Sequence, residues 1–174
     1  MVLTPNCNKI MKRLLIIPAR IGSKRIKKKN IRKFHGKPII YYSIQNAIKS
    51  GLFYKIHVST DSKIVSKISE KNSIKTDFYR TKKLSDDNTK LIDVYRYVVK
   101  KYLDLNLKFD EVWFLSACSP LVTTQDLKNA TKFFKRIKTN SFLSINEYSP
   151  PIQWAMKINK KKRLIPISSY SRKI

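Results

Sequence analysis

Six basic side chains follow the apolar segment 14–19 within ten residues: Arg20, Lys24, Arg25, Lys27, Lys28 and Lys29. Gly22 and Ser23 lie among them. A glycine lets the backbone approach a ligand closely, and a serine adds a hydroxyl group. Such a set suits a polyphosphate, because cationic donors make charge-assisted hydrogen bonds to phosphate oxygens. The alternative is that these cations only reflect the very basic composition of the whole chain and bind no ligand.

The loop matches neither of two common nucleotide-binding motifs. It lacks the Gly-x-x-x-x-Gly-Lys-Ser/Thr pattern of the Walker A loop and the Gly-x-Gly-x-x-Gly pattern of dinucleotide turns. Its position still favours an anion site, because ligands of open α/β sheets bind beyond the carboxyl ends of the strands.

The elements that must position this loop alternate between strands and helices. Apolar runs predict strands at 13–18, 54–59, 111–116 and 141–146. Apolar spacing and end signals predict helices over 38–50, 91–105 and 123–138, the last with a Thr-x-x-Asp start. A further helix is predicted to begin at Asp61, which would be its N-cap. A late hairpin is predicted over 154–158 and 163–167. The alternation favours an α/β fold with right-handed βαβ units and a mainly parallel sheet covered by helices on both faces.

The charge of the chain raises the question of nucleic acid. The 174 residues include 38 Lys and Arg against 11 Asp and Glu, a formal charge of +27. Only nine of the basic residues are Arg, and the Lys residues are spread along the whole chain. Because Lys is the weaker choice for bidentate recognition of phosphate or guanine, we expect no specific nucleic-acid partner.

The remaining composition indicates a cytoplasmic domain. Cys7 and Cys118 match no metal-ligand spacing and predict no disulfide framework. No apolar run approaches the ~20 residues that span a bilayer, so no membrane partner is expected. Residues 1–12 are predicted to be an N-terminal extension.

Several motifs carry a resemblance to a known family. They are PARIGSK at 18–24 with KN at 29–30, FHGKP at 34–38, YSI at 42–44, VSTDS at 58–62, Arg80 with LSDD at 84–87, SPL at 119–121 and PIQ at 151–153. Over residues 13–166 the chain resembles the acylneuraminate cytidylyltransferases (CMP-nonulosonate synthetases), and most closely those that activate pseudaminic acid. The resemblance implies a Rossmann-like, three-layer α/β/α nucleotidyltransferase fold of the GT-A type, with the domain over 13–174 lacking its C-terminal part.

The resemblance also implies a reaction. These enzymes transfer CMP from CTP to the anomeric hydroxyl of an acidic nine-carbon α-keto acid sugar, pseudaminic acid or an N-acylneuraminate, for surface glycans or flagellin. They release pyrophosphate, use Mg²⁺ and are usually homodimers. By resemblance, the nucleotide-binding residues are Arg20, Ser23, Lys24, Lys29, Asn30, Arg80, Ser85 and Asp86, with Arg20 and Lys29 also catalytic. The sugar-binding residues are Ser116, Ser119 and Gln153.

The sequence departs from the family at several positions. Ile21 replaces a Gly or polar residue, Ser116 replaces a Gln, and Val122 replaces a frequent Arg. No Asp follows Asp126, although the family carries a metal-binding Asp late in the chain, so the metal ligands are not assigned. Two alternatives stay open: an active synthetase that uses another carboxylate, or a catalytically weak or silent CTP-binding remnant.

Overall fold

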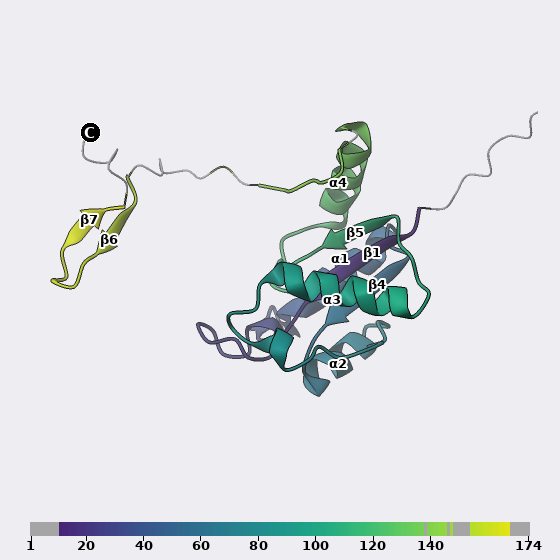
Figure 1. Cartoon of the computed structure of the whole chain (residues 1–174), viewed down its shortest axis with the longest axis horizontal. Helices are drawn as coiled ribbons and strands as arrows, with labels where there is room; N and C mark the ends of the chain where they lie inside the picture. The colour runs from purple at the N-terminus through teal and green to yellow at the C-terminus, as the bar shows by residue number, and fades with distance from the viewer. Residues whose placement is uncertain (1–10, 138, 146, 148–153, 168–174) are drawn as a thin grey trace, which may run out of the picture. The chain divides into compact units, whose positions relative to one another are not determined.

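The structure, a computed structural model, describes residues 11–137, 139–145, 147 and 154–167 (Figure 1). The chain divides into two units, Met1–Arg136 and Ile137–Ile174, and each is described by itself. The first unit carries a parallel sheet and its helices, and the second carries a small antiparallel hairpin. In the described part of the chain, no helix combines the length and the apolar character that crossing a membrane requires.

The central strand of the sheet is β1 (Arg13–Pro18), which lies between β4 (Lys55–Ser59) and β5 (Glu111–Phe114). Both neighbours run parallel to β1. The first five residues of β1 are all buried. A parallel strand that is paired on both edges and covered on both faces needs apolar side chains, which is why the strand is apolar from Leu14 to Pro18.

Each face of the sheet has its own hydrophobic core, because successive side chains of a strand point to opposite faces. On one face Leu15 packs with residues of α1 (Ile39–Ser50) and α2 (Lys63–Glu70). On the other face Leu14 packs with residues of α3 (Leu91–Asp104), the helix that crosses the sheet in Figure 1. The predicted α/β fold, a parallel sheet with helices on both faces, is therefore confirmed.

The ends of two helices show where local signals were interpreted correctly and where they were not. Gly51 ends α1 with a φ of 65°, the left-handed conformation predicted for a glycine stop. The prediction that Asp61 caps α2 is wrong, because Ser62 is the N-cap and its Oγ accepts a hydrogen bond from the Ile64 amide (3.2 Å). Asp61 instead accepts a hydrogen bond at Oδ1 from the amide of Ile21 (3.0 Å), in the loop after β1.

A reciprocal capping box begins α4 (Thr124–Ile137), as the Thr-x-x-Asp pattern predicts. The Thr123 amide and hydroxyl both donate to Asp126 Oδ2, at 2.8 and 2.7 Å. The Asp126 amide donates back to Thr123 Oγ1 (3.1 Å). These bonds satisfy amides that the helix itself leaves without a partner.

Replacing Thr123 by Ala should lower the free energy of unfolding by about 1 kcal/mol, because it removes the side-chain acceptor at the N-cap. Urea unfolding of the variant measures the loss. Thr123→Ser keeps the hydroxyl and serves as the matched control, with stability close to that of the parent chain. An equal loss in both variants would show that the methyl group, rather than the cap, matters at this position.

β2 (Lys33–Phe34) and β3 (Lys37–Pro38) form a β-hairpin with a two-residue turn, which directly precedes α1. Its turn residues His35 and Gly36 have φ angles of 42° and 76°, both in the left-handed region that tight hairpin turns require. The Tyr42 hydroxyl donates to the Phe34 carbonyl (2.8 Å) and ties the hairpin to α1. These short strands are not among the elements predicted from the sequence.

In the second unit, β6 (Met156–Ile158) pairs with β7 (Leu164–Pro166) in antiparallel fashion, which confirms the predicted late hairpin. The strand predicted over 141–146 is wrong for residues 141–145, which form no strand; residue 146 lies outside the described residues. Leu143 and Ile145 are both more than four-fifths exposed. An apolar segment becomes a strand only where a neighbour pairs with it and covers one face, and local sequence does not determine that.

Candidate functional site

The loop after β1 is fixed to the carboxyl end of the sheet. The Ala19 amide donates to the carbonyl of Ser59, the last residue of β4 (2.8 Å). Asn30 is buried and donates from Nδ2 to the Arg20 carbonyl (2.8 Å), so the loop folds back on itself. These contacts hold the basic side chains at the edge of the sheet where ligand sites of α/β folds occur.

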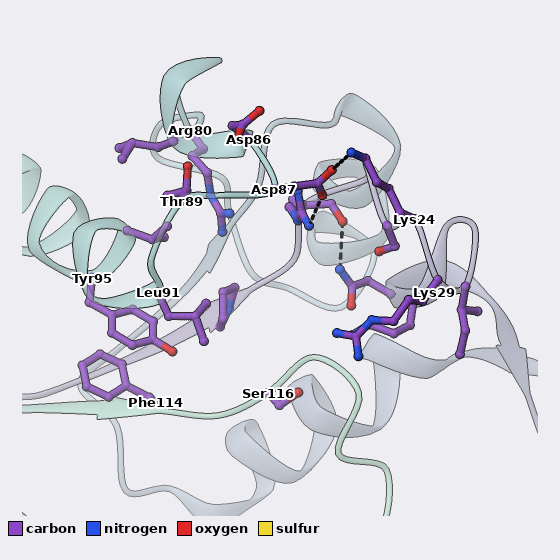
Figure 2. Close-up of a pocket in the computed structure, with 18 residues that line it drawn as sticks. Lys24, Lys29, Arg80, Asp86, Asp87, Thr89, Leu91, Tyr95, Phe114 and Ser116 are labelled. Carbon is purple, nitrogen blue, oxygen red and sulfur yellow. Dashed lines mark hydrogen bonds and ion pairs between the residues drawn. The ribbon is translucent and has the colours of Figure 1, made fainter. Parts of the chain in front are cut away.

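A cavity of about 710 Å³ opens at this edge, with a polar end and an apolar end (Figure 2). The polar end is lined by Arg20, Ser23, Lys24, Arg25, Lys29, Asn30, Arg80, Asp86, Asp87 and Thr89. The apolar end is lined by Leu91, Val94 and Tyr95 of α3 and by Phe114 of β5. The volume is in the range of small-molecule sites, and the two ends together suit a ligand that is highly charged at one end only.

Ion pairs connect the loop after β1 to the segment 81–90. Asp87 Oδ1 lies 2.5 Å from Arg20 Nη2, and Asp87 Oδ2 lies 2.5 Å from Lys24 Nζ. Arg20 Nη1 also donates to the Ser85 carbonyl (3.2 Å). The hydrogen bond with Asp87 raises the pKa of Lys24, and the hydrogen bonds from Lys24 and Arg20 lower the pKa of the Asp87 carboxyl.

Arg80 is a buried cation beside the cavity. Its Nη2 donates to the Ser59 carbonyl (2.8 Å), and its Nε donates to Ser59 Oγ (3.3 Å). Its own amide donates to the Thr60 carbonyl (2.7 Å), so both backbone and side chain are fixed to the end of β4. Burial lowers the pKa of the Arg80 guanidinium. Among the described residues no carboxylate accepts a hydrogen bond from Arg80, so this firmly held cation presents a fixed positive charge to a ligand.

The structure brings most of the predicted site residues together. Eight of them line the cavity: Arg20, Ser23, Lys24, Lys29, Asn30, Arg80, Asp86 and Ser116. Ser85 does not line it, because its hydroxyl donates to the Thr81 carbonyl (2.9 Å) and only its carbonyl meets Arg20. Ser119 does not line it either, and Gln153 lies outside the described residues. The roles of all these residues stay predictions.

Sequence reasoning missed the apolar end of the cavity and gave Asp87 no role among the nucleotide-binding residues. The rings of Tyr95 and Phe114 are stacked, with centroids 3.7 Å apart and planes 13° from parallel. Phe114 belongs to the predicted apolar strand 111–116 and is about half exposed. A signal was available in the helix register, because Leu91, Val94 and Tyr95 share one face of α3 directly after the polar segment 81–90.

The described residues do not form a protein-built metal centre. Among them no three His, Cys, Asp or Glu side chains converge. The carboxylates that line the cavity are Asp86 and Asp87, and both oxygens of Asp87 already meet cations. Asp86 Oδ1 accepts a hydrogen bond from the Asn88 amide (2.8 Å). This donor set does not fit a Mg²⁺ ion held by the protein alone, which needs a near-octahedral set of oxygen ligands.

Comparisons with curated proteins identify relatives over most of the chain. The pseudaminic acid cytidylyltransferase of Campylobacter jejuni is 38% identical over 154 residues, which cover 88% of this chain and 66% of the relative. The CMP-N,N'-diacetyllegionaminic acid synthase of Legionella pneumophila is 30% identical over 155 residues, which cover 89% of this chain and 66% of the relative. The chain thus spans just under two thirds of the length of these relatives.

Solved structures agree on the fold. A CMP:2-keto-3-deoxy-manno-octonic acid synthetase complexed with CTP matches with a TM-score of 0.60 and 22% identity, over 72% of this chain and 48% of that structure. A cytidylyltransferase from Leptospira borgpetersenii matches with a TM-score of 0.58 and 23% identity, over 74% of this chain and 50% of that structure. The three-layer nucleotidyltransferase fold is therefore confirmed.

The family itself follows from a family model. The model described as cytidylyltransferase matches residues 14–150, a span that includes the parallel sheet from Leu14 onward and every residue that lines the cavity. Because this model matches most of the chain and a relative is 38% identical over 88% of this chain, the chain belongs to the cytidylyltransferase family.

Proposed function

We propose that the chain transfers CMP from CTP to a nine-carbon α-keto acid sugar with release of pyrophosphate. The observation that carries this proposal is the cavity at the end of β1, with its cationic end formed by Arg20, Lys24 and Lys29. The relatives that cover most of the chain support the choice of nucleotide and sugar, because they are named for the cytidylation of pseudaminic and legionaminic acids.

The reaction needs what the polar end of the cavity offers. Attack of the sugar hydroxyl on the α-phosphorus forms a P–O bond to the sugar and breaks the bond to the β-phosphate, so that pyrophosphate leaves. Cations must shield the triphosphate before attack and stabilise the charge on the leaving group. Arg20 and Lys29 are proposed to contact the reacting phosphates, and Lys24 and Ser23 are proposed to bind the rest of the triphosphate.

The other predicted residues take the remaining parts of the substrates. Asn30, Arg80, Ser85 and Asp86 are proposed to bind the nucleoside, and Ser116, Ser119 and Gln153 are proposed to bind the sugar. Arg80 is the best supported of these, because its guanidinium is fixed by hydrogen bonds to Ser59 beside the cavity. Ser116 has the next best support, because it lines the cavity and its own carbonyl is held by the Ser43 hydroxyl (2.9 Å).

Pseudaminic acid is the preferred sugar in this proposal, and flagellin or a surface glycan is the preferred destination. The Campylobacter jejuni relative is named for pseudaminic acid. A flagellin modification protein of Campylobacter coli is 34% identical over 132 residues, which cover 75% of this chain and 56% of that protein. A cytoplasmic location is proposed from the composition, and a homodimer is proposed from the family resemblance.

A requirement for Mg²⁺ is also proposed from the resemblance. Because the described residues do not form a metal centre, the ion would be bound mainly by oxygens of the substrate. Magnesium in nucleotide enzymes is often held in this way, by one or two carboxylates together with phosphate oxygens and water. Pyrophosphate release measured with Mg²⁺ and with EDTA tests the requirement.

The proposed function is tested by pyrophosphate release from CTP in the presence of pseudaminic acid, with N-acetylneuraminic acid and UTP as the alternative substrates. We expect release that depends on both CTP and the nine-carbon sugar. CTP binding in calorimetry without any release would favour the silent CTP-binding alternative. The absence of both CTP binding and release would contradict the proposed function.

A further inference from the structure

Asp87 lies between Arg20 and Lys24, the two cations that are predicted to bind the triphosphate. Figure 2 shows a dashed line from the Asp87 carboxylate to Lys24. Each carboxylate oxygen meets one cation at 2.5 Å. All three residues line the cavity, so the pair of contacts lies within the site.

Two ionic oxygens on one carbon, each held by a different cation, resemble two oxygens of a phosphate group. Phosphate and carboxylate are the anions that guanidinium and ammonium groups bind in the same way. A phosphate that enters the polar end therefore meets donors that already have a partner. It must either share these donors with Asp87 or displace the carboxylate.

The ion pair between Lys24 and Asp87 is poorly suited to a purely structural role. The Lys24 side chain is 83% exposed, and the Arg20 and Asp87 side chains are each about one quarter exposed. An ion pair as open to water as the one between Lys24 and Asp87 contributes little to stability. Arg20 also has a second anchor, because its Nη1 donates to the Ser85 carbonyl, so its position does not depend on Asp87 alone.

We propose that Asp87 is an internal counter-ion that competes with phosphate for Arg20 and Lys24. It offsets half of the positive charge of the two cations while the site is empty, it is displaced when the triphosphate binds, and it pairs with the cations again as pyrophosphate leaves. This inference rests on the proposed function, in that the cavity is taken to accept a polyphosphate. In this role Asp87 speeds the release of pyrophosphate and lowers the affinity of the site for the triphosphate.

Binding of inorganic pyrophosphate by the whole chain, measured by calorimetry, tests this role. Asp87→Asn keeps the shape of the side chain but removes the competing charge, so pyrophosphate should bind roughly three- to tenfold more tightly than to the parent chain. Asp87→Glu keeps the competitor and should bind pyrophosphate about as the parent does. The difference between Asn and parent should shrink as salt is raised, because the competition is electrostatic.

Asp104→Asn is the matched control for net charge. It makes the same substitution at the other end of α3 from Leu91, about 20 Å away at 1.5 Å of rise per residue, and should leave pyrophosphate binding unchanged. A change in this control equal to that in Asp87→Asn would mean that overall charge, rather than competition, controls binding, and would overturn the proposal.

The remaining outcomes are equally decisive. Pyrophosphate binding that is unchanged or weaker in Asp87→Asn would overturn the proposal, and a weaker value would identify Asp87 as a residue that positions the cations. The absence of pyrophosphate binding in both proteins would also overturn it. Failure of the proposed function looks different, because tighter pyrophosphate binding in Asp87→Asn without any turnover of CTP would support the counter-ion and contradict only the transferase.

Discussion

Replacing Arg20 by Ala is expected to weaken CTP binding by roughly ten- to hundredfold, because each charge-assisted contact to a phosphate contributes on the order of 1.5–3 kcal/mol. Arg20 lines the cavity and carries two anchors, the Asp87 carboxylate and the Ser85 carbonyl. Its loss removes a positioned cation and two contacts between the segment 81–90 and the loop after β1, while the ion pair between Lys24 and Asp87 stays. Calorimetric titration with CTP gives the size of the effect.

The control for this substitution is Arg136→Ala, which removes the same side chain from the end of α4. Arg136 does not line the cavity, and its guanidinium lies over the Phe133 ring. We expect CTP to bind this variant as it binds the parent chain. Unchanged binding in Arg20→Ala as well would show that the phosphates lie elsewhere.

The second large effect concerns a buried histidine on the side of the sheet that carries α3. Burial lowers the pKa of His57 from its usual 6.5 to about 4, against the opposing effect of Asp77. The Tyr102 hydroxyl donates to Asp77 Oδ2 (2.6 Å), so the contact between Tyr102 and His57 Nδ1 (3.0 Å) needs the proton on Nδ1. His57 Nε2 is buried without a hydrogen-bond partner, so a second proton on the ring would have no acceptor.

Stability should therefore fall as the pH is lowered from about 6.5 to about 4. In this interval the unfolded chain binds a proton at His57 that the folded chain does not bind, so acid favours unfolding. The contribution of neutral His57 to the free energy of unfolding is fully present above pH 6.5 and amounts to about 3 kcal/mol at most. Urea unfolding at several pH values measures it.

Two variants separate His57 from other titrating groups. His57→Asn retains a donor near Nδ1 but does not titrate, and it should flatten the dependence on pH between 4 and 6.5. His35→Asn removes the other histidine, which is exposed and has a φ of 42° that asparagine tolerates, and should retain the full dependence. The prediction fails if the two variants respond alike.

The loop after β1 shows how far the sequence alone leads. Its role as a site was predictable, because an apolar strand, a glycine and a group of cations in that order need no information from elsewhere in the chain. Asp87 was not assigned a role there, because its contact with Arg20 joins residues that are distant in sequence, and Asp86 beside it offers the same carboxylate. Only the fold determines which of two adjacent acids faces the loop.

The same limit explains the other misses. Asp61 and Ser62 are both good helix caps by type, and the choice of Ser62 depends on Asp61 being needed by the Ile21 amide across the loop. Segment 141–145 has the composition of a strand, but composition cannot supply a pairing partner. Phe114 is of a residue type that is usually buried, but its exposure depends on where the cavity opens.

The central position of β1 has a consequence for synthesis of the protein on the ribosome. β1 is made first, and its pairing with β4 needs only the first third of the chain. Its pairing with β5 joins Arg13 to Glu111, 98 residues later. Each doubling of the loop that must close costs about 0.6 kcal/mol of chain entropy. A nascent chain therefore holds the most apolar strand of the sheet with one edge open until β5 has left the ribosome, which makes this interval the one most exposed to aggregation.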